Sequence, residues 1–284
     1  MNRGLSPGQL LSALTEWLNP VLGSPEDRSV ASLVIEKIFG LNRGHISATN
    51  RLEISEATIP LINHMLRRLL SHEPVQYILE EAFFYDRFFD VNPSVLIPRS
   101  ETEELCRMII EENTSGNLRV LDIGTGSGCI AIILALWMKN PEVDGWDISQ
   151  DILNTAIRNA RKHQVGVKFG LKDIFESVGS MDPYDIIVSN PPYVTFRESP
   201  AIRKNVLDFE PHTAIFAGDE DPLRFYRRIL QCVNQLLKKD GKIYFEINEA
   251  YGPSLIRLLE EYQVREIKLI QDIHGKDRFI KGIR

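Results

Sequence analysis

Four consecutive residues, Asn190-Pro191-Pro192-Tyr193, are the part of this sequence best suited to chemistry. The two prolines stiffen the segment, so that the Asn190 side chain and the Pro191 carbonyl become two fixed acceptors aimed at one NH2 group. An amide or aromatic amino nitrogen is a poor nucleophile because its lone pair is delocalised, and two acceptors on its hydrogens return electron density to it. With Tyr193 against the flat group, the segment predicts a reaction of a planar NH2 nitrogen that depends on positioning rather than on a strong base. The alternative is an ordinary turn, in which Asn and Pro are both common.

A second candidate is the glycine-rich run LRVLDIGTGSG at residues 118–128, which is followed by the helix-like CIAIILALWMK. Gly124, Gly126 and Gly128 lack Cβ atoms, so the backbone can approach a ligand closely, and the N-terminus of the following helix offers unpaired amides. This order of strand, glycine turn and helix predicts a nucleotide-like cofactor. It does not separate a nicotinamide dinucleotide from adenosylmethionine.

Two acidic residues follow at positions where they could bind the adenosine part of either cofactor. Asp147 ends the strand-like VDGWDI, about twenty residues after the glycine turn, where a carboxylate can accept hydrogen bonds from both ribose hydroxyls. The alternative is a helix N-cap beside Ser149. Asp173 could bind the adenine amino group, with Ile174 and Phe175 covering the ring. An Asp in a surface turn beside a core Phe is the competing interpretation.

The elements that must position these residues alternate between strand and helix. Strand patterns occur at residues 118–123, 143–148, 165–170, 184–190 and 242–247, with helical patterns between them. This alternation predicts an α/β fold whose mostly parallel sheet is covered by helices on both faces. Asn190 then follows the fourth strand, at the carboxyl edge where ligands bind in such sheets. Residues 264–283 predict an antiparallel hairpin at the sheet edge, with its turn at His274-Gly275-Lys276-Asp277.

The first 75 residues favour a small helical bundle. Ser6-Pro7 and Ser24-Pro25 each place a capping hydroxyl before a proline suited to a first helical turn, Gly40 can end the second helix, and a third helix begins near Pro60. With no catalytic cluster, this region is expected to recognise or dock a substrate. Aromatic and β-branched residues at 76–98 predict a β-hairpin linker, and residues 99–284 a catalytic domain.

Composition limits the possible partners. The formal net charge of −6 argues against tight binding to a phosphate backbone, so long nucleic acid is not an expected substrate. No apolar run approaches the roughly 20 residues of a membrane span and the N-terminus lacks a signal peptide, so we expect a cytoplasmic protein without membrane association. Three cysteines without CxxC spacing and six histidines without HExxH predict neither a disulfide framework nor a metal site. A monomer is the expected state.

The segments DIGTGSG, WDIS and SNPPYV, in this order and spacing, resemble class I S-adenosylmethionine-dependent methyltransferases with an NPPY motif. Three longer segments are similar to the release factor glutamine methyltransferases, the PrmC/HemK family. They are EPVQYILEEAFFYDRFFDVNPSVLIPRSETEEL, DFEPHTAIFAGDEDPLRFYRRI and HGKDRFIKG. The resemblance covers roughly residues 73–284, and the helical N-terminal region agrees in kind. That family often has an aromatic residue at position 174, where this chain has Ile174.

The resemblance implies methylation of the side-chain nitrogen N5 of the glutamine in the GGQ motif of peptide chain release factors. S-adenosyl-L-methionine is then the cofactor and S-adenosyl-L-homocysteine its product. It implies that Asn190 through Tyr193 grip the glutamine and that Arg99, Glu101 and Thr102 belong to a segment closing over the site. The implied cofactor contacts are Gly124, Thr125, Gly126, Ser127, Gly128, Asp147, Asp173 and Asn190.

Two other functions compete with this one. An enzyme for adenine N6 or another nucleobase amino group meets the same chemical problem, although the acidic balance counts against it. A non-catalytic protein that binds S-adenosylmethionine and docks a partner is the second, and it leaves the NPPY motif without a purpose.

Overall fold

The computed structural model describes residues 6–41 and 58–284, so residues 1–5 and 42–57 of the predicted helical domain lie outside the described part. The chain forms two compact units. Unit 1 contains residues 1–80 and 203–209, and unit 2 contains residues 81–202 and 210–284. None of the helices in the described part is long and apolar enough to cross a lipid bilayer.

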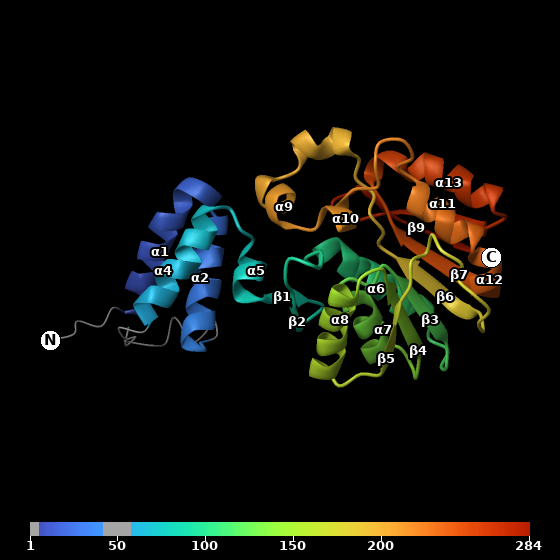
Figure 1. Cartoon of the computed structure of the whole chain (residues 1–284), viewed down its shortest axis with the longest axis horizontal. Coiled ribbons are helices and arrows are strands. Elements are labelled where there is room, and N and C mark those ends of the chain that lie inside the picture. Colours follow the sequence, from blue (N-terminus) through green and yellow to red (C-terminus); the bar gives the residue numbers. More distant parts are fainter. Residues whose placement is uncertain (1–5, 42–57) are drawn as a thin grey trace. The chain divides into compact units, whose positions relative to one another are not determined.

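Unit 1 is helical (Figure 1). Its described elements are α1 (Pro7–Leu22), α2 (Glu26–Phe39), α4 (Thr58–Leu70), α5 (Val75–Leu79) and the short α9 (Lys204–Phe209). Apolar side chains of α1, α2, α4 and α5 form one buried cluster that includes Leu18, Val34 and Leu69. Burial of such a cluster is the main favourable contribution to folding a small bundle.

The helix ends of unit 1 follow the sequence in two places and depart from it in one. Ser6 caps α1 as predicted, because its hydroxyl accepts from the backbone N–H of Gln9 at 3.2 Å, while the Gln9 side chain accepts from the N–H of Ser6. Gly40 ends α2 in the left-handed conformation, with φ 63°. The prediction that Ser24 caps α2 is wrong. The cap position is Pro25, which makes no side-chain cap bond, and acidic residues in the first turn complement the helix dipole instead.

The predicted linker hairpin is shorter than its sequence pattern. Only β1 (Glu81–Phe84) and β2 (Arg87–Asp90) pair, and they form a separate two-stranded antiparallel sheet. Residues 75–79, which the sequence analysis assigned largely to this hairpin, are helical because Ile78 and Leu79 pack into the cluster of unit 1. Burial of these side chains outweighs the strand preference of their residue types.

Unit 2 contains a seven-stranded sheet with the order β5-β4-β3-β6-β7-β9-β8. The first five of these strands pair in parallel and β9 is antiparallel to both neighbours, which confirms the predicted sheet and its closing hairpin. The strands are β3 (Arg119–Ile123), β4 (Glu142–Asp147), β5 (Val167–Leu171), β6 (Tyr184–Ser189), β7 (Leu237–Glu246), β8 (Arg265–Gln271) and β9 (Asp277–Ile283).

Helices cover both faces of this sheet, as the alternation of patterns predicted (Figure 1). Those on one face are α6 (Ser100–Glu112), α7 (Cys129–Trp137) and α8 (Gln150–Lys162), and those on the other are α11 (Arg224–Gln231), α12 (Val233–Leu236) and α13 (Gly252–Glu261). The connection after β6 contains the short elements η1 (Phe196–Ala201) and α10 (His212–Ile215), and η2 (Glu249–Tyr251) precedes α13. Alternate residues of the central strands enter the two clusters, so that Tyr244 of β7 faces one layer and Phe245 the other.

The strand order reverses between β3 and β6. From β3 the chain proceeds to β4 and β5 on one side, and it then returns to β6 on the other side. In open α/β sheets, ligands bind outside the carboxyl ends of the strands at such a reversal. Ile123 and Ser189 are paired residues at these two strand ends, so the glycine turn and the NPPY segment begin side by side.

Candidate functional site

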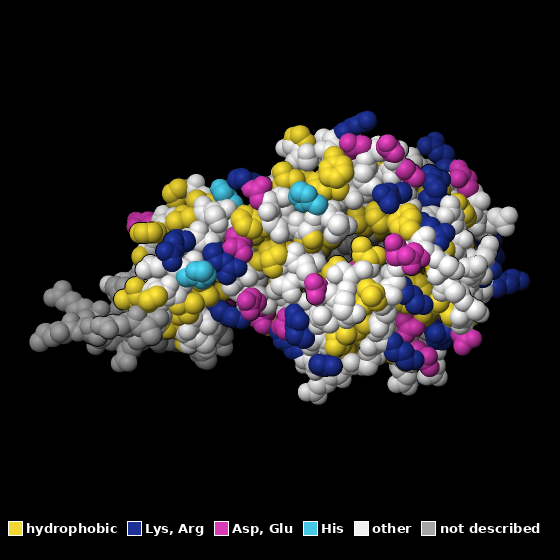
Figure 2. All heavy atoms as spheres, viewed as in Figure 1, with side chains coloured by type: hydrophobic (Ala, Val, Ile, Leu, Met, Phe, Trp, Pro, Cys, Tyr) yellow, Lys and Arg dark blue, Asp and Glu magenta, His cyan; other side chains and the backbone are white. Residues whose placement is uncertain are grey.

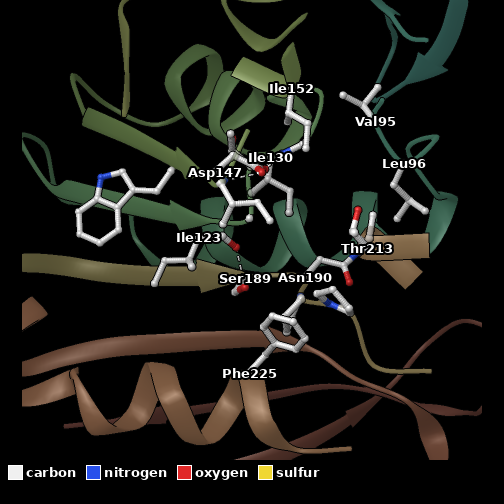
Figure 3. Close-up of a pocket in the computed structure, with 18 of the residues that line it drawn as sticks. Val95, Leu96, Ile123, Ile130, Asp147, Ile152, Ser189, Asn190, Thr213 and Phe225 are labelled. Carbon is white, nitrogen blue, oxygen red and sulfur yellow. Dashed lines mark hydrogen bonds between the residues drawn. The ribbon is translucent and has the colours of Figure 1, made fainter. Parts of the chain in front are cut away.

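A cavity of about 380 Å³ lies at the carboxyl ends of β3, β4 and β6 in unit 2. Figure 3 shows the Ser189 hydroxyl bonded to the carbonyl of Ile123, with Asn190 immediately beyond the strand end. The two oxygen atoms of this hydrogen bond are 2.6 Å apart. In Figure 2, hydrophobic side chains gather around a hollow on the visible face of unit 2. Thirteen of the predicted site residues line the cavity: Arg99, Thr102, Gly124, Thr125, Gly126, Ser127, Asp147, Asp173, Ile174, Phe175, Asn190, Pro191 and Pro192. Glu101, Gly128 and Tyr193, by contrast, are not among the lining residues.

The glycine turn lies open to the cavity. Gly124 and Gly126 have φ of 76° and 57°, and a Cβ built on either would meet no atom within 4 Å. Their positive φ favours glycine, and the missing side chains leave space for a ligand beside the backbone. The amides of Gly124 and Thr125 both donate to the carbonyl of Trp146 at 2.9 Å, which fixes the turn to the end of β4.

Gly128 has a different role from the other two glycines. Its φ is 81°, and a Cβ there would lie 3.1 Å from the Cβ of Ala156 and 3.1 Å from a methyl carbon of Ile132. This glycine therefore permits close packing of α7 against α8. The three glycines look alike in the sequence, but in the structure Gly128 has a different role from the other two.

A buried acid beneath the cavity stabilises the glycine turn. The Thr125 hydroxyl donates to Asp122 at 2.7 Å, and Asp122 is fully buried at the end of β3. Burial raises the pKa of Asp122 to about 7, although its bond to Thr125 opposes this shift.

Asp147 presents its carboxylate to the cavity while two backbone amides hold it in place. One oxygen accepts from the N–H of Gly126 at 2.9 Å, and the other accepts from the N–H of Ile148 at 2.8 Å. A carboxylate has about four acceptor sites, so two remain for a pair of hydroxyls. Burial raises the pKa of Asp147. The cap position of α8 is Ser149, so the alternative in which Asp147 caps that helix does not apply.

The apolar wall of the cavity includes both predicted residues, Ile174 and Phe175, which differ in exposure. Ile174 is 6% exposed and belongs mainly to the core, whereas Phe175 is 39% exposed. Phe175 packs edge-to-face against Phe225 at 5.3 Å, and the Arg224 guanidinium lies 4.7 Å from the centre of the Phe175 ring. Asp173 accepts from the N–H of Phe175 at 2.8 Å, which is the local turn that the competing interpretation described. A role for Asp173 in binding adenine stays a prediction.

The NPPY segment is fixed from two directions. Beyond it, the N–H of Val194 donates to the carbonyl of Ile215, and the N–H of Ala217 donates to the carbonyl of Val194. At its start, Nδ2 of Asn190 donates to the Thr102 hydroxyl at 3.3 Å. With Nδ2 occupied in this way, the carbonyl oxygen Oδ1 is the end of the Asn190 amide available to a ligand in the cavity.

Tyr193 packs beside the core cluster rather than lining the cavity. Its hydroxyl donates to Glu246 Oε1 at 3.3 Å, and burial raises the pKa of the Tyr193 phenol above its usual range. The expected contact of this ring with a flat substrate group stays a prediction. The hydrogen bond gives the side chain a second, structural role that the motif did not reveal.

Hydrogen bonds to one buried acid connect the segment before α6 to the region after η1. Glu210 is 4% exposed, accepts from Arg99 at 2.7 Å and from the N–H of Ile97 at 3.1 Å. Arg99 and Ile97 both line the cavity, so this carboxylate holds one wall of the site in place. Glu101 instead accepts from the Ser100 hydroxyl at the surface of α6.

Sequence reasoning missed Glu246 and Phe225. Glu246 is 1% exposed at the carboxyl end of β7, and burial raises its pKa to about 7. Its signal in the sequence was a single acid at the end of the apolar run IYF, where an unpaired charge is costly. Phe225 had no comparable signal, because its place in the cavity wall depends on the path of the chain between β6 and α11.

Comparisons with known proteins cover both units of the chain. Residues 114–268 match a family model described as a methyltransferase domain, and residues 9–79 match one described as a PrmC N-terminal domain. A release factor glutamine methyltransferase of Bacteroides thetaiotaomicron is 42% identical over 97% of this chain and 99% of its own length. The protein of the same name from Flavobacterium psychrophilum is 41% identical over 93% and 94%. A methyltransferase of Pyrococcus furiosus shares the fold, with a TM-score of 0.51, 16% identity, and coverage of 78% of this chain and 98% of its own.

Proposed function

This chain belongs to the family of release factor glutamine methyltransferases, and from that premise we propose how its own residues perform the reaction. It is an enzyme that methylates a glutamine of peptide chain release factors. In our proposal the acceptor is the side-chain nitrogen N5 of the glutamine in the GGQ motif. The donor is S-adenosyl-L-methionine, whose sulfonium supplies an activated methyl group and which leaves as S-adenosyl-L-homocysteine.

The residues around the cavity fit this donor. Gly124 and Gly126 leave backbone space beside the turn, and the free acceptor sites of Asp147 match the two hydroxyls of a ribose. The edge-to-face pair of Phe175 and Phe225 offers an aromatic wall for the adenine ring. In this chain Phe175, which the sequence analysis named, is joined by Phe225, while position 174 carries Ile174 where the family often has an aromatic residue.

Asn190 and Pro191 orient the amide nitrogen of the substrate. Oδ1 of Asn190 and the carbonyl of Pro191 each accept one hydrogen of the NH2 group, so that its lone pair points at the methyl carbon. The N–C bond forms as the C–S bond breaks, the pair from that bond passes to sulfur, and one proton leaves the nitrogen for solvent. Positioning at about 3 Å, in line with the departing sulfur, accounts for most of the rate without a strong base.

One observation supports this proposal above the others. The paired residues Ile123 and Ser189 bring the glycine turn and Asn190 to neighbouring strand ends that share a single cavity. A cofactor held by one would therefore present its reactive group to the other.

The test is incubation of the protein with labelled S-adenosylmethionine and full-length release factor, followed by mass mapping of the modified residue. We expect one methyl group on the GGQ glutamine. For Asn190→Ala we expect cofactor binding to persist while turnover falls by at least about 10²-fold, the scale of losing a positioned polar group. Label found in RNA or DNA, with release factor unlabelled, would refute the proposal. Basic and acidic side chains are interspersed on the face of unit 2 seen in Figure 2, which favours the protein substrate.

We propose that unit 1 binds the release factor outside the GGQ loop. Support comes from its match to the PrmC N-terminal domain and from its helical bundle, which is of a type suited to docking. The monomeric state and the cytoplasmic location stay predictions.

A further inference from the structure

Hydrogen bonds connect Glu246 to both ends of the NPPY segment. One carboxylate oxygen accepts from the Thr102 hydroxyl at 2.6 Å, and Thr102 in turn accepts from Nδ2 of Asn190 at 3.3 Å. The other oxygen accepts from the Tyr193 hydroxyl at 3.3 Å. We call these four side chains the Glu246 relay: Thr102, Asn190, Tyr193 and Glu246.

The relay has a direction because a hydroxyl has a single hydrogen. Thr102 gives that hydrogen to Glu246, so only its lone pairs face Asn190. Asn190 must then present its NH2 end to Thr102, which turns Oδ1 toward the cavity. If Thr102 gave its hydrogen to Asn190 instead, the amide would turn over and offer the substrate two donors in place of an acceptor.

We propose that Glu246 is a positioning residue for methyl transfer: by accepting from Thr102, it fixes which end of the Asn190 amide faces the substrate nitrogen. This inference deepens the proposed function and rests on it. Glu246 touches neither substrate nor cofactor in this account, because it lies behind Thr102 and outside the lining of the cavity.

Burial makes this arrangement dependent on pH. Removal from water raises the pKa of Glu246 to about 7, against the opposing effects of its bonds to Thr102 and Tyr193 and of nearby Arg278. Above that pH the carboxylate can only accept, and the relay keeps its direction. Below it, a protonated Glu246 can donate to Thr102 and release the constraint on Asn190. The other titratable groups that interact with Glu246 are Glu101, Cys106, Cys129, Tyr226 and Arg278.

The principal test is Glu246→Gln, which preserves shape but allows either end of the new amide to face Thr102. We expect kcat for release factor to fall by at least about tenfold, with the Kd for S-adenosylhomocysteine unchanged, since only orientation is lost. The kcat of the unaltered protein should rise with pH through about 7, and this inflection should disappear in Glu246→Gln. The control is Glu112→Gln, which removes a carboxylate that also accepts from a tyrosine, Tyr244 at 3.0 Å, away from the site.

Variants of Thr102 keep the test decisive if Glu246→Gln fails to fold. Thr102→Ser retains the hydroxyl and should keep most of kcat, whereas Thr102→Val has nearly the same shape without it and should lose kcat as Glu246→Gln does. Normal kcat in Thr102→Val, or a normal pH profile in Glu246→Gln, would overturn the relay. Failure of the unaltered protein and of Glu112→Gln to methylate release factor would instead refute the proposed function.

Discussion

Replacing Asp147 by alanine tests the binding of the cofactor ribose at a single carboxylate. Two of the acceptor sites of this carboxylate are already used by the amides of Gly126 and Ile148, which leaves two for ribose hydroxyls. Hydrogen bonds to a charged group contribute about 1.5–3 kcal/mol. We therefore expect Asp147→Ala to raise the Kd for S-adenosylhomocysteine about 10- to 150-fold, the range to which that free energy corresponds.

Isothermal titration calorimetry measures this change directly. Asp147→Asn keeps one acceptor oxygen and should lose less affinity than Asp147→Ala. The matched control is Asp144→Asn, which changes an acid on the same strand that accepts from Tyr184 at 2.6 Å and lies outside the cavity lining. An unchanged Kd in Asp147→Ala would show that the ribose binds elsewhere. Equal losses in Asp147→Ala and Asp144→Asn would show that the effect comes from β4 as a whole.

Three further outcomes are expected. Gly128→Ala should lower the free energy of unfolding by at least about 1 kcal/mol in urea denaturation, because its φ of 81° is strained for alanine and its Cβ would crowd Ala156 at 3.1 Å; an unchanged midpoint would contradict this. Arg99→Ala should lower that free energy by about 1–3 kcal/mol, since the buried Glu210 loses a charged partner, and a double variant with Glu210→Gln should recover part of it. Removal of residues 1–75 should raise the KM for full-length release factor while leaving the Kd for S-adenosylhomocysteine unchanged; a normal KM would refute docking by unit 1.

The sequence predicted the parts of the fold in which local pattern and tertiary environment agree. The strand of residues 119–123 contains the buried apolar residues Val120, Leu121 and Ile123, and the turn after it contains glycines where φ is positive, so both signals lead to the same structure. The strand prediction for residues 75–79 failed for the opposite reason. Their β-branched and aromatic side chains favour a strand, but contacts with helices distant in the sequence made them helical.

The same contrast between local sequence pattern and tertiary contact applies to the candidate site. The position of Asn190 followed from its place after a parallel strand, because the carboxyl ends of such strands share one edge. Asn190 is connected to Glu246 through Thr102, and Glu246 lies 144 residues from Thr102 in the chain. No local sequence pattern indicates a contact over that separation. This contact depends on the register between β6 and β7 and on the position of α6 beside them. Both are properties of the folded structure.

In the proposed reaction, Asn190 and Pro191 hold the glutamine nitrogen beside the methyl donor. A crystal structure with S-adenosylhomocysteine and a GGQ-containing release factor measures this geometry. We predict Oδ1 of Asn190 and the carbonyl oxygen of Pro191 both within about 3 Å of that nitrogen, and the nitrogen facing the sulfur. A glutamine nitrogen out of reach of both oxygens, or an Asn190 amide whose NH2 end faces the substrate, would contradict the account.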